Sequence, residues 1–192
     1  AWLDDHAGGT DSGAAYIFQW DGSRWVQQQK LTASDADRFE RYGLSVSVNG
    51  ECAFVGSPDA NCTAGPACGA VYAYRFDGAR WMEEQKLLAS DAHPLAVFGV
   101  SAQVDGDLAV VGDWRHDCAA GQDCGAVYVF RFDGLRWTQE QKLTASDASA
   151  FDGFGISVSV RDDLIIVGAL WDDPMGSNSG AAYVYRFSGA RW

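Results

Sequence analysis

The chain has 192 residues, of which 47% are hydrophobic and 13% aromatic, with 22 Gly and only 4 Pro. This composition is typical of a globular, turn-rich protein and excludes a disordered one. The formal net charge of −12 argues against nucleic acid as a partner, because phosphate binding needs a basic surface, and no apolar run approaches the roughly 18 residues that span a bilayer.

One phrase recurs along the chain at a fixed spacing. Trp25, Trp81 and Trp137 are separated by equal intervals, and Trp192 follows at almost the same interval. Each of them ends a copy of the pattern Gly-Ala-x-Tyr-x-x-x-x-x-Gly-x-Arg-Trp. Such a period indicates a repeated supersecondary unit that buries its apolar face on its neighbours, so we expect these tryptophans to be packing residues. Function is then expected where the copies differ.

Within one copy the residues predict four strands in chain order. Residues 154–160 alternate between small or polar and apolar side chains, residues 163–168 form a continuous apolar run, and a loop of about a dozen residues leads to residues 180–187. The fourth strand, residues 137–143 in the preceding copy, is the most polar and fits a solvated edge. Two-residue hairpins are predicted to join the first two strands at Asn49-Gly50, Asp105-Gly106 and Arg161-Asp162.

Four-stranded antiparallel meanders of this kind predict an all-β protein, a β-propeller in which each meander is one blade. A linear β-solenoid is the alternative, although its rungs are shorter and its strands parallel. The chain reads as one propeller segment over residues 1–192. It is expected to divide into a partial blade at 1–35, blades at 36–91 and 92–147, and a partial blade at 148–192 that lacks its outer strand. Because Ala1–Asp5 matches Ala169–Asp173, we expect an excerpt of a longer array.

The motifs resemble a known repeat family. Phe154-Gly155 is followed by Val167-Gly168-Ala169, Phe98-Gly99 by Val111-Gly112-Asp113, and Tyr42-Gly43 by Val55-Gly56-Ser57, an order that resembles the FG-GAP repeat of integrin-like β-propellers. The ending Trp-x-x-x-Gln-Lys-Leu-x-Ala-Ser-Asp is similar to the bacterial-type version, found in secreted and cell-surface proteins. The resemblance covers essentially the whole chain. It implies a seven-bladed ring, of which this segment supplies about half and the same chain or another subunit the remainder.

The cysteines predict disulfides. Cys62 and Cys68 lie in the loop between the second and third strands, Cys118 and Cys124 occupy the same places in the next copy, and the outer copies lack both members of the pair. Gain and loss as a pair indicates a disulfide within each loop, with a four-thiolate zinc site as the alternative. Cys52 has no counterpart and is expected to be a small buried hydrophobe. Two disulfides indicate an oxidising compartment: extracellular, cell-surface or periplasmic.

Variation gathers in two kinds of loop, those after the second strand and those between blades, which emerge on the same face of a meander blade. This face is where integrin-like propellers carry their partner site, and flat aromatic side chains beside charges suit a protein or a sugar. The alternative for the loop tryptophans is that they only hold the loops onto the blades. The predicted partner-binding residues are Trp2, Asp4, Asp5, Arg38, Asp59, His93, Trp114, Arg115, His116, Trp171, Asp172 and Asp173.

The sequence therefore favours a binding or structural module that acts in protein–protein interaction or adhesion. A lectin-like role is the alternative, and a propeller-scaffold hydrolase or lyase comes next. No catalytic, cofactor-binding or metal-binding residue is predicted, because no nucleophile elbow, phosphate loop or His-rich metal motif occurs and Ser-Asp recurs in every copy. The calcium site that the resemblance implies is expected to be absent, since the hairpins are too short to supply its oxygen ligands. The acid pairs Asp4-Asp5 and Asp172-Asp173 are the remaining candidates for a cation.

Overall fold

A computed structural model describes residues 10–192 and contains, in that range, thirteen strands and no helix. All strand pairings within the sheets are antiparallel. No helix of the described residues is long and apolar enough to cross a membrane. The strands are β1 (Ala15–Trp20), β2 (Trp25–Leu31), β3 (Val46–Asn49), β4 (Cys52–Ser57), β5 (Ala70–Phe76), β6 (Trp81–Leu87), β7 (Ser101–Asp105), β8 (Leu108–Asp113), β9 (Ala126–Phe132), β10 (Trp137–Leu143), β11 (Phe154–Arg161), β12 (Leu164–Ala169) and β13 (Ala181–Arg186).

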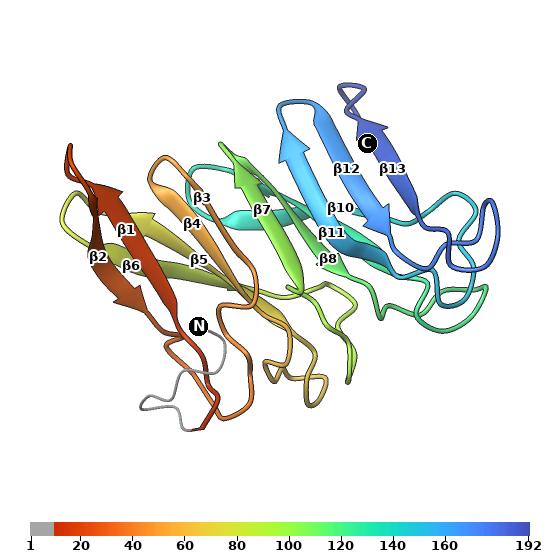
Figure 1. Cartoon of the computed structure of the whole chain (residues 1–192), viewed down its shortest axis with the longest axis horizontal. Helices are drawn as coiled ribbons and strands as arrows, with labels where there is room; N and C mark the ends of the chain where they lie inside the picture. Colours follow the sequence, from red (N-terminus) through yellow and green to blue (C-terminus); the bar gives the residue numbers. More distant parts are fainter. Residues whose placement is uncertain (1–9) are drawn as a thin grey trace.

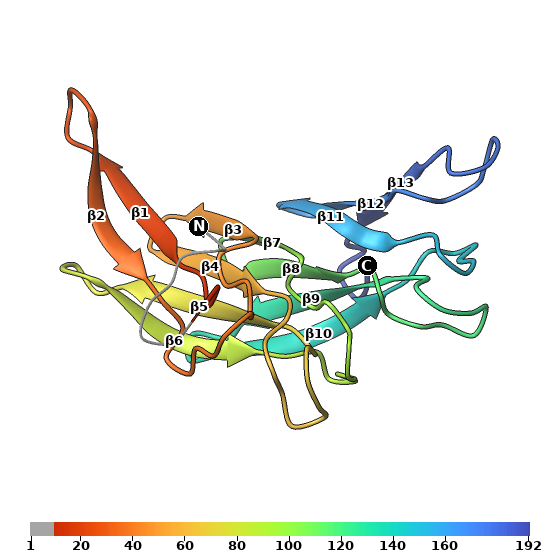
Figure 2. The ribbon, with the colours of Figure 1, turned by 60° about the horizontal axis from the view of Figure 1, so that its bottom comes forward.

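The strands form four sheets that follow one another along the molecule (Figure 1). Two complete meanders, β3–β4–β5–β6 and β7–β8–β9–β10, are flanked by the two-stranded β1–β2 sheet and the three-stranded β11–β12–β13 sheet. The inner strands β3, β7 and β11 contact one another in succession, while β6 and β10 lie at the far edges. In the second view the inner strands β3, β7 and β11 lie on one side of the molecule, and the outer strands β6 and β10 lie on the other (Figure 2). The predicted all-β architecture of propeller blades is confirmed.

Each pair of neighbouring sheets encloses its own hydrophobic core. Between the two complete blades the core contains Phe54 and Val71 from one sheet and Val111, Tyr128 and Trp137 from the other, all at most 2% exposed. A second cluster fills the space between β1–β2 and β3–β6, and a third the space between β7–β10 and the last sheet. Because a strand alternates its side chains between two faces, each complete sheet contributes to two cores. Stability therefore comes from stacking, as the repeat predicts.

Glycines of the repeated motifs lie where the backbones of neighbouring blades come into close contact. Gly125, which precedes β9, pairs in a parallel bridge with Phe154, the first residue of β11. Gly155 has a φ of +95°, and a Cβ built there would come 2.5 Å from the carbonyl oxygen of Ala126. A Cβ on Gly112 would overlap the carbonyl oxygen of Gly155. Only glycine allows the two backbones this contact.

Two further repeated contacts join the blades. The Gln29 side chain donates to the carbonyl oxygen of Trp81 at 2.9 Å and accepts from its backbone N–H at 2.8 Å, and Gln85 holds Trp137 in the same way. Asp91 accepts hydrogen bonds from Tyr128 at 2.8 Å and Lys142 at 2.7 Å in the next blade. The recurring Trp-x-x-x-Gln and Ser-Asp motifs therefore act as contacts between blades.

Two details differ from the sequence-based expectation. The two-residue loops of the first hairpins are 50–51, 106–107 and 162–163, one residue later than predicted, because Asn49 pairs with Cys52 and Asp105 with Leu108. The framework tryptophans are also not equally packed. Trp81 and Trp137 are 7% and 2% exposed, whereas Trp25 is 67% exposed because no described residue packs over its sheet on that side. Cys52 is buried, as expected, and burial raises its thiol pKa to about 11.

Candidate functional site

The two kinds of variable loop meet at one edge of the blades. This edge, the lower one in Figure 1, is formed by residues 32–45, 58–69, 88–100, 114–125, 144–153 and 170–180, and we call it the loop face. Backbone hydrogen bonds connect the two kinds directly. The N–H of Leu95 donates to the carbonyl oxygen of Pro66 at 3.1 Å, and the N–H of Phe151 donates to the backbone carbonyl oxygen of Gln122 at 2.8 Å. The expected convergence of these loops is therefore present.

A buried carboxyl group holds the loop face in each of three blades. Glu40 accepts the backbone N–H groups of Asp37 and Asn61, Asp113 accepts that of Val97 at 3.0 Å, and Asp152 accepts that of Ser149 at 2.6 Å. Burial raises the pKa of Glu40 and Asp152 and raises that of Asp113 to about 6. The accepting side chain comes from the connecting loop in two blades and from the end of β8 in the third. What recurs is therefore a buried side-chain acceptor for backbone N–H groups, and not its position in the sequence.

Disulfides close two loops of the loop face. Cys62 is bonded to Cys68 and Cys118 to Cys124, each with a Cα–Cα distance of 5.8 Å. The disulfide prediction is confirmed, and the four-thiolate zinc alternative is wrong because all four sulfur atoms are bonded in pairs. Such bonds indicate an oxidising compartment.

The thiols give a direct experiment. We expect the native chain to show one free thiol, Cys52, that reacts only after unfolding because it is buried. Converting Cys118 and Cys124 to serine together should lower the free energy of unfolding by about 2 kcal/mol, because the cross-link restricts the unfolded chain. Thiol counting by mass spectrometry and urea denaturation measure the two effects. Detection of free thiols at the four loop cysteines of the chain purified without reductant would contradict the assignment.

Three apolar residues project from the loop face at equivalent positions. Phe39, Leu95 and Phe151 are 57%, 63% and 58% exposed, and their φ angles are +65°, +66° and +71°. A positive φ is rare for bulky side chains and costs on the order of 1–3 kcal/mol, a strain that glycine would avoid. The framework therefore does not explain why an apolar side chain recurs here. We call these residues the apolar triad.

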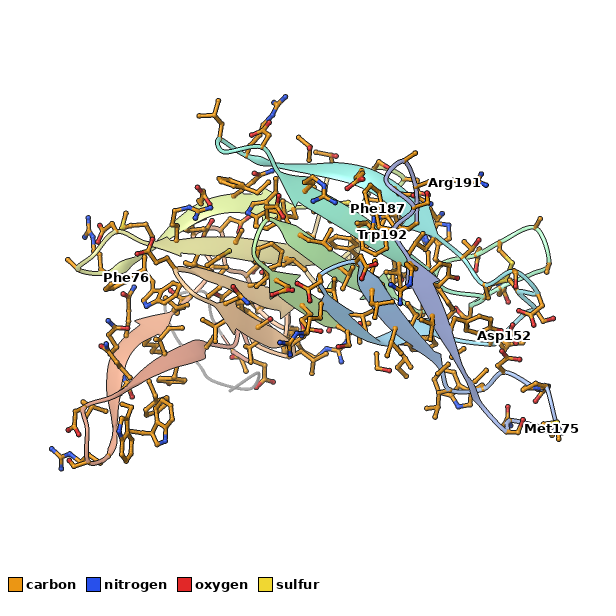
Figure 3. All side chains as sticks on the ribbon, turned by 90° about the horizontal axis from the view of Figure 1, so that it is seen from above. Phe76, Asp152, Met175, Phe187, Arg191 and Trp192 are labelled. Atoms are coloured by element: carbon orange, nitrogen blue, oxygen red, sulfur yellow. A yellow bond between two sulfur atoms is a disulfide. The ribbon has the colours of Figure 1, made fainter. Side chains whose placement is uncertain are left out.

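An aromatic pair lies between the last two blades. Trp114 and Trp171 are both half-buried, their ring centroids are 5.1 Å apart, and the exposed Arg115 guanidinium lies 5.1 Å from the centre of the Trp114 ring. A Cβ on Gly153 would overlap the Trp171 ring, so Trp171 rests on the connecting loop. The pair thus packs the loops while keeping one side in solvent. Nearby, Met175 is 91% exposed at the tip of the β12–β13 loop and projects away from the sheets (Figure 3).

The predicted acidic and basic residues are distributed over the loop face. Asp59 is paired with Arg41, and Arg38 is exposed. Asp172 is buried and accepts a hydrogen bond from the Tyr183 hydroxyl, and the exposed Asp173 accepts one from the backbone of Asn178. Trp2, Asp4 and Asp5 lie outside the described residues.

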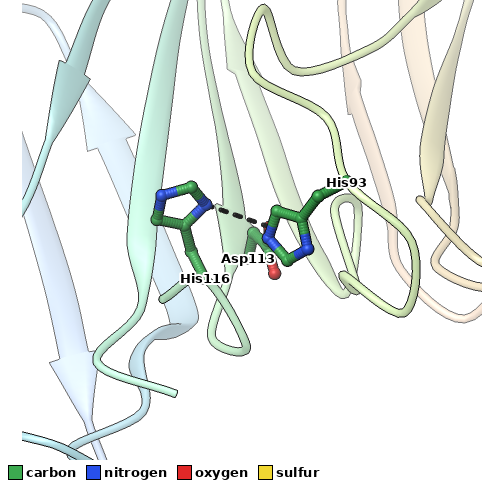
Figure 4. A group of neighbouring side chains, drawn as sticks. All are labelled: His93, Asp113 and His116. Carbon is green, nitrogen blue, oxygen red and sulfur yellow. Dashed lines mark ion pairs between the residues drawn. The ribbon is translucent and has the colours of Figure 1, made fainter. Parts of the chain in front are cut away.

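Two of the predicted residues come together with a third that the prediction omitted. His93, Asp113 and His116 each offer a ligand atom, and these atoms lie within 4.8 Å of one another (Figure 4). His93 comes from the connecting loop, Asp113 ends β8, and His116 follows it on the β8–β9 loop. His116 Nδ1 lies 4.0 Å from Asp113 Oδ2 and 3.2 Å from the Tyr128 hydroxyl.

The surroundings of His116 disfavour its charged form. Burial and the nearby Lys142 ammonium lower the pKa of His116. For Asp91, burial alone would raise the pKa, but hydrogen bonds from Lys142 and Tyr128 outweigh it and hold the pKa below its usual value. A neutral imidazole carries a lone pair, so His116 is suited to act as an acceptor or a metal ligand.

The fold and the repeated motifs define a blade-repeat protein whose variable loops share one face. The family model for the FG-GAP repeat matches residues 25–74, 81–130 and 137–185. The chain therefore belongs to the FG-GAP repeat family, in agreement with the resemblance seen in the sequence. No curated protein matches this chain.

The sequence reasoning missed the apolar triad and Asp113. The triad carried a usable signal, because Phe39, Leu95 and Phe151 recur at the period of the repeat in connections that otherwise vary from copy to copy. Asp113 had none, since Ser57 and Ala169 occupy its place in the neighbouring copies.

Proposed function

We propose that this chain is a non-enzymatic, extracellular binding module that holds a protein partner on its loop face. The apolar triad carries the proposal. Exposed apolar side chains at three equivalent, strained backbone positions are expected where the side chains are used for contact. The half-buried Trp114–Trp171 pair and the exposed Met175 extend the same surface with residue types that are enriched in protein interfaces.

Charge and compartment add two features to the expected partner. The net charge of −12 favours a protein with positive charge around an apolar contact area, because complementary potentials speed encounter. The two disulfides support a partner outside the cytoplasm. The exposed residues Arg38, Arg115 and Asp173 would form a polar rim around the apolar contacts.

The test replaces the three apolar side chains of the triad and keeps the positive φ of the backbone at each position. Asparagine tolerates positive φ, so Phe39→Asn, Leu95→Asn and Phe151→Asn combined should leave the chain folded. We expect the triple variant to bind a protein captured from a cell-surface extract at least about 100-fold more weakly than the unaltered chain, because central apolar contacts each contribute about 1–2 kcal/mol. Biolayer interferometry with the purified partner measures the change.

A control and an alternative complete the experiment. Leu135 is 87% exposed in the β9–β10 turn at the opposite edge, and Leu135→Asn should leave the affinity unchanged. Equal binding by the unaltered chain and the triple variant would contradict the proposal. The lectin-like alternative rests on the aromatic pair, and selective retention on a glycan array that Trp114→Ala abolishes and the triple variant keeps would favour it instead.

A further inference from the structure

We propose that His93, Asp113 and His116 form a binding site for one divalent transition-metal ion of the zinc class. Two imidazoles and one carboxylate suit such ions, and three protein ligands leave one position of a tetrahedral ion for a water molecule. The site is separate from the apolar triad and does not depend on the protein-binding function. In the structure the ligand atoms lie within 4.8 Å of one another, so a shared ion requires them to close by about 1 Å.

His93 is already arranged as a ligand. Its Nδ1 lies 3.2 Å from the carbonyl oxygen of Pro94, an acceptor, so the proton resides on Nδ1 and the lone pair on Nε2. Nε2 is buried and has no hydrogen-bond partner. A metal ligand commonly donates its second ring N–H to a backbone carbonyl in this way. An orphaned buried acceptor next to a carboxyl group and a second imidazole is explained by an ion.

Within residues 10–192 this set of ligands occurs once, unlike the framework around it. In the preceding copy Asp37, Ser57 and Ala60 take the places of His93, Asp113 and His116, and in the following copy Ser149, Ala169 and Asp172 take them. The buried acid itself has a framework role, because Glu40 and Asp152 supply it in those blades. Neither histidine side chain supplies that backbone acceptor, and the pair of histidines distinguishes this blade.

Lys142 competes with the ion, and this gives the proposal a specific consequence. Its ammonium lies 2.5 Å from His116 Nε2, so in the free protein Nε2 accepts and Nδ1 carries the proton. To bind metal through Nδ1, His116 must move this proton to Nε2, where Asp91 Oδ2, at 3.8 Å, is the acceptor that replaces Lys142. Metal binding is thus expected to reverse the His116 tautomer and to displace Lys142.

The experiment titrates the oxidised full chain with Zn²⁺ by calorimetry and repeats the titration with Co²⁺ by visible absorption. We expect one ion per chain, at least tenfold weaker binding in His93→Gln and in His116→Gln, and about tenfold tighter binding in Lys142→Met, because a nearby cation is removed. Two substitutions serve as controls and should change nothing. They are Lys86→Met, the equivalent lysine, whose blade has Ala60 in the place of His116, and His6→Gln, the third histidine of the chain.

A further variant tests whether a loss of Zn²⁺ affinity could come from a loss of folding. Asp113→Asn keeps the Oδ1 acceptor for Val97 and should stay folded by circular dichroism while losing Zn²⁺ affinity at least tenfold. Long-range ¹H–¹⁵N spectra should place the His116 proton on Nδ1 without metal and on Nε2 with Zn²⁺. Absence of binding at millimolar Zn²⁺, or equal binding by the unaltered chain and both histidine variants, would overturn the proposal.

Discussion

Substituting alanine for Gly125 is expected to lower the free energy of unfolding by more than about 3 kcal/mol. Gly125 has a φ of +89°, and an alanine Cβ there would overlap the backbone of Phe154 in the next blade. Neither backbone can move alone, because both are held by backbone hydrogen bonds. The Gly125 N–H donates to the carbonyl oxygen of His116 at 2.9 Å, and the Phe154 N–H donates to the carbonyl oxygen of Cys124 at 3.1 Å. The substitution therefore separates two blades.

Gly134 provides the matched control for this substitution. Its φ of +95° is nearly the same, but it lies in the β9–β10 turn and a Cβ there meets nothing within 4 Å. Gly134→Ala therefore carries the conformational cost alone, about 1 kcal/mol. Urea denaturation of both variants measures the difference. Equal losses would mean that the glycine is required for its φ and not for contact between the blades.

Replacing Trp137 with alanine is expected to destabilise the chain by about 3–5 kcal/mol, while the same change at Trp25 costs less than about 0.5 kcal/mol. Trp137 is 2% exposed and its ring lies 4.9 Å from that of Phe54 in the preceding blade and 5.3 Å from that of Phe132 in its own. Trp25 occupies the equivalent repeat position but is 67% exposed.

The Trp137 and Trp25 pair separates the effect of the repeat motif from the effect of the neighbouring blade. If the motif stabilised each unit internally, through contacts such as that of Trp20 with Trp25 at 5.7 Å, the two substitutions would have similar effects. If stacking stabilises it, only Trp137→Ala is costly. Thermal unfolding monitored by circular dichroism distinguishes these outcomes, and similar melting temperatures for the two variants would contradict the stacking account.

The strands and their order could be predicted because a fixed period repeats every local signal. Alternation in residues 154–160 and the apolar run of residues 163–168 correspond directly to β11 and β12. The exposure of Trp25 could not be predicted from its motif, since Trp25 and Trp137 share it and differ only in what packs beside them. Burial is a property of the assembly of blades, which a local pattern does not record.

The loop face was only partly predictable for a related reason. The convergence of the two loop types follows from antiparallel connectivity, and the pairing of Trp114 with Trp171 lies within it. The positive φ of Leu95 does not follow from its residue type, because such conformations are expected at glycine and asparagine. The approach of His93 to Asp113 depends on contacts between a connecting loop and the end of a strand, with β7 between them in the chain. A residue pattern does not predict how close the His93 and Asp113 side chains come.

The central claim is that the loop face, and not the sheets or the opposite hairpin turns, engages a partner. Hydrogen exchange followed by mass spectrometry, with and without the captured protein, tests it most directly. We predict that binding protects peptides covering residues 36–41, 92–97 and 148–153 and leaves the turns at 50–51, 106–107 and 133–136 unchanged. Protection of those turns, with the three loop-face peptides exchanging as in the free chain, would contradict the claim.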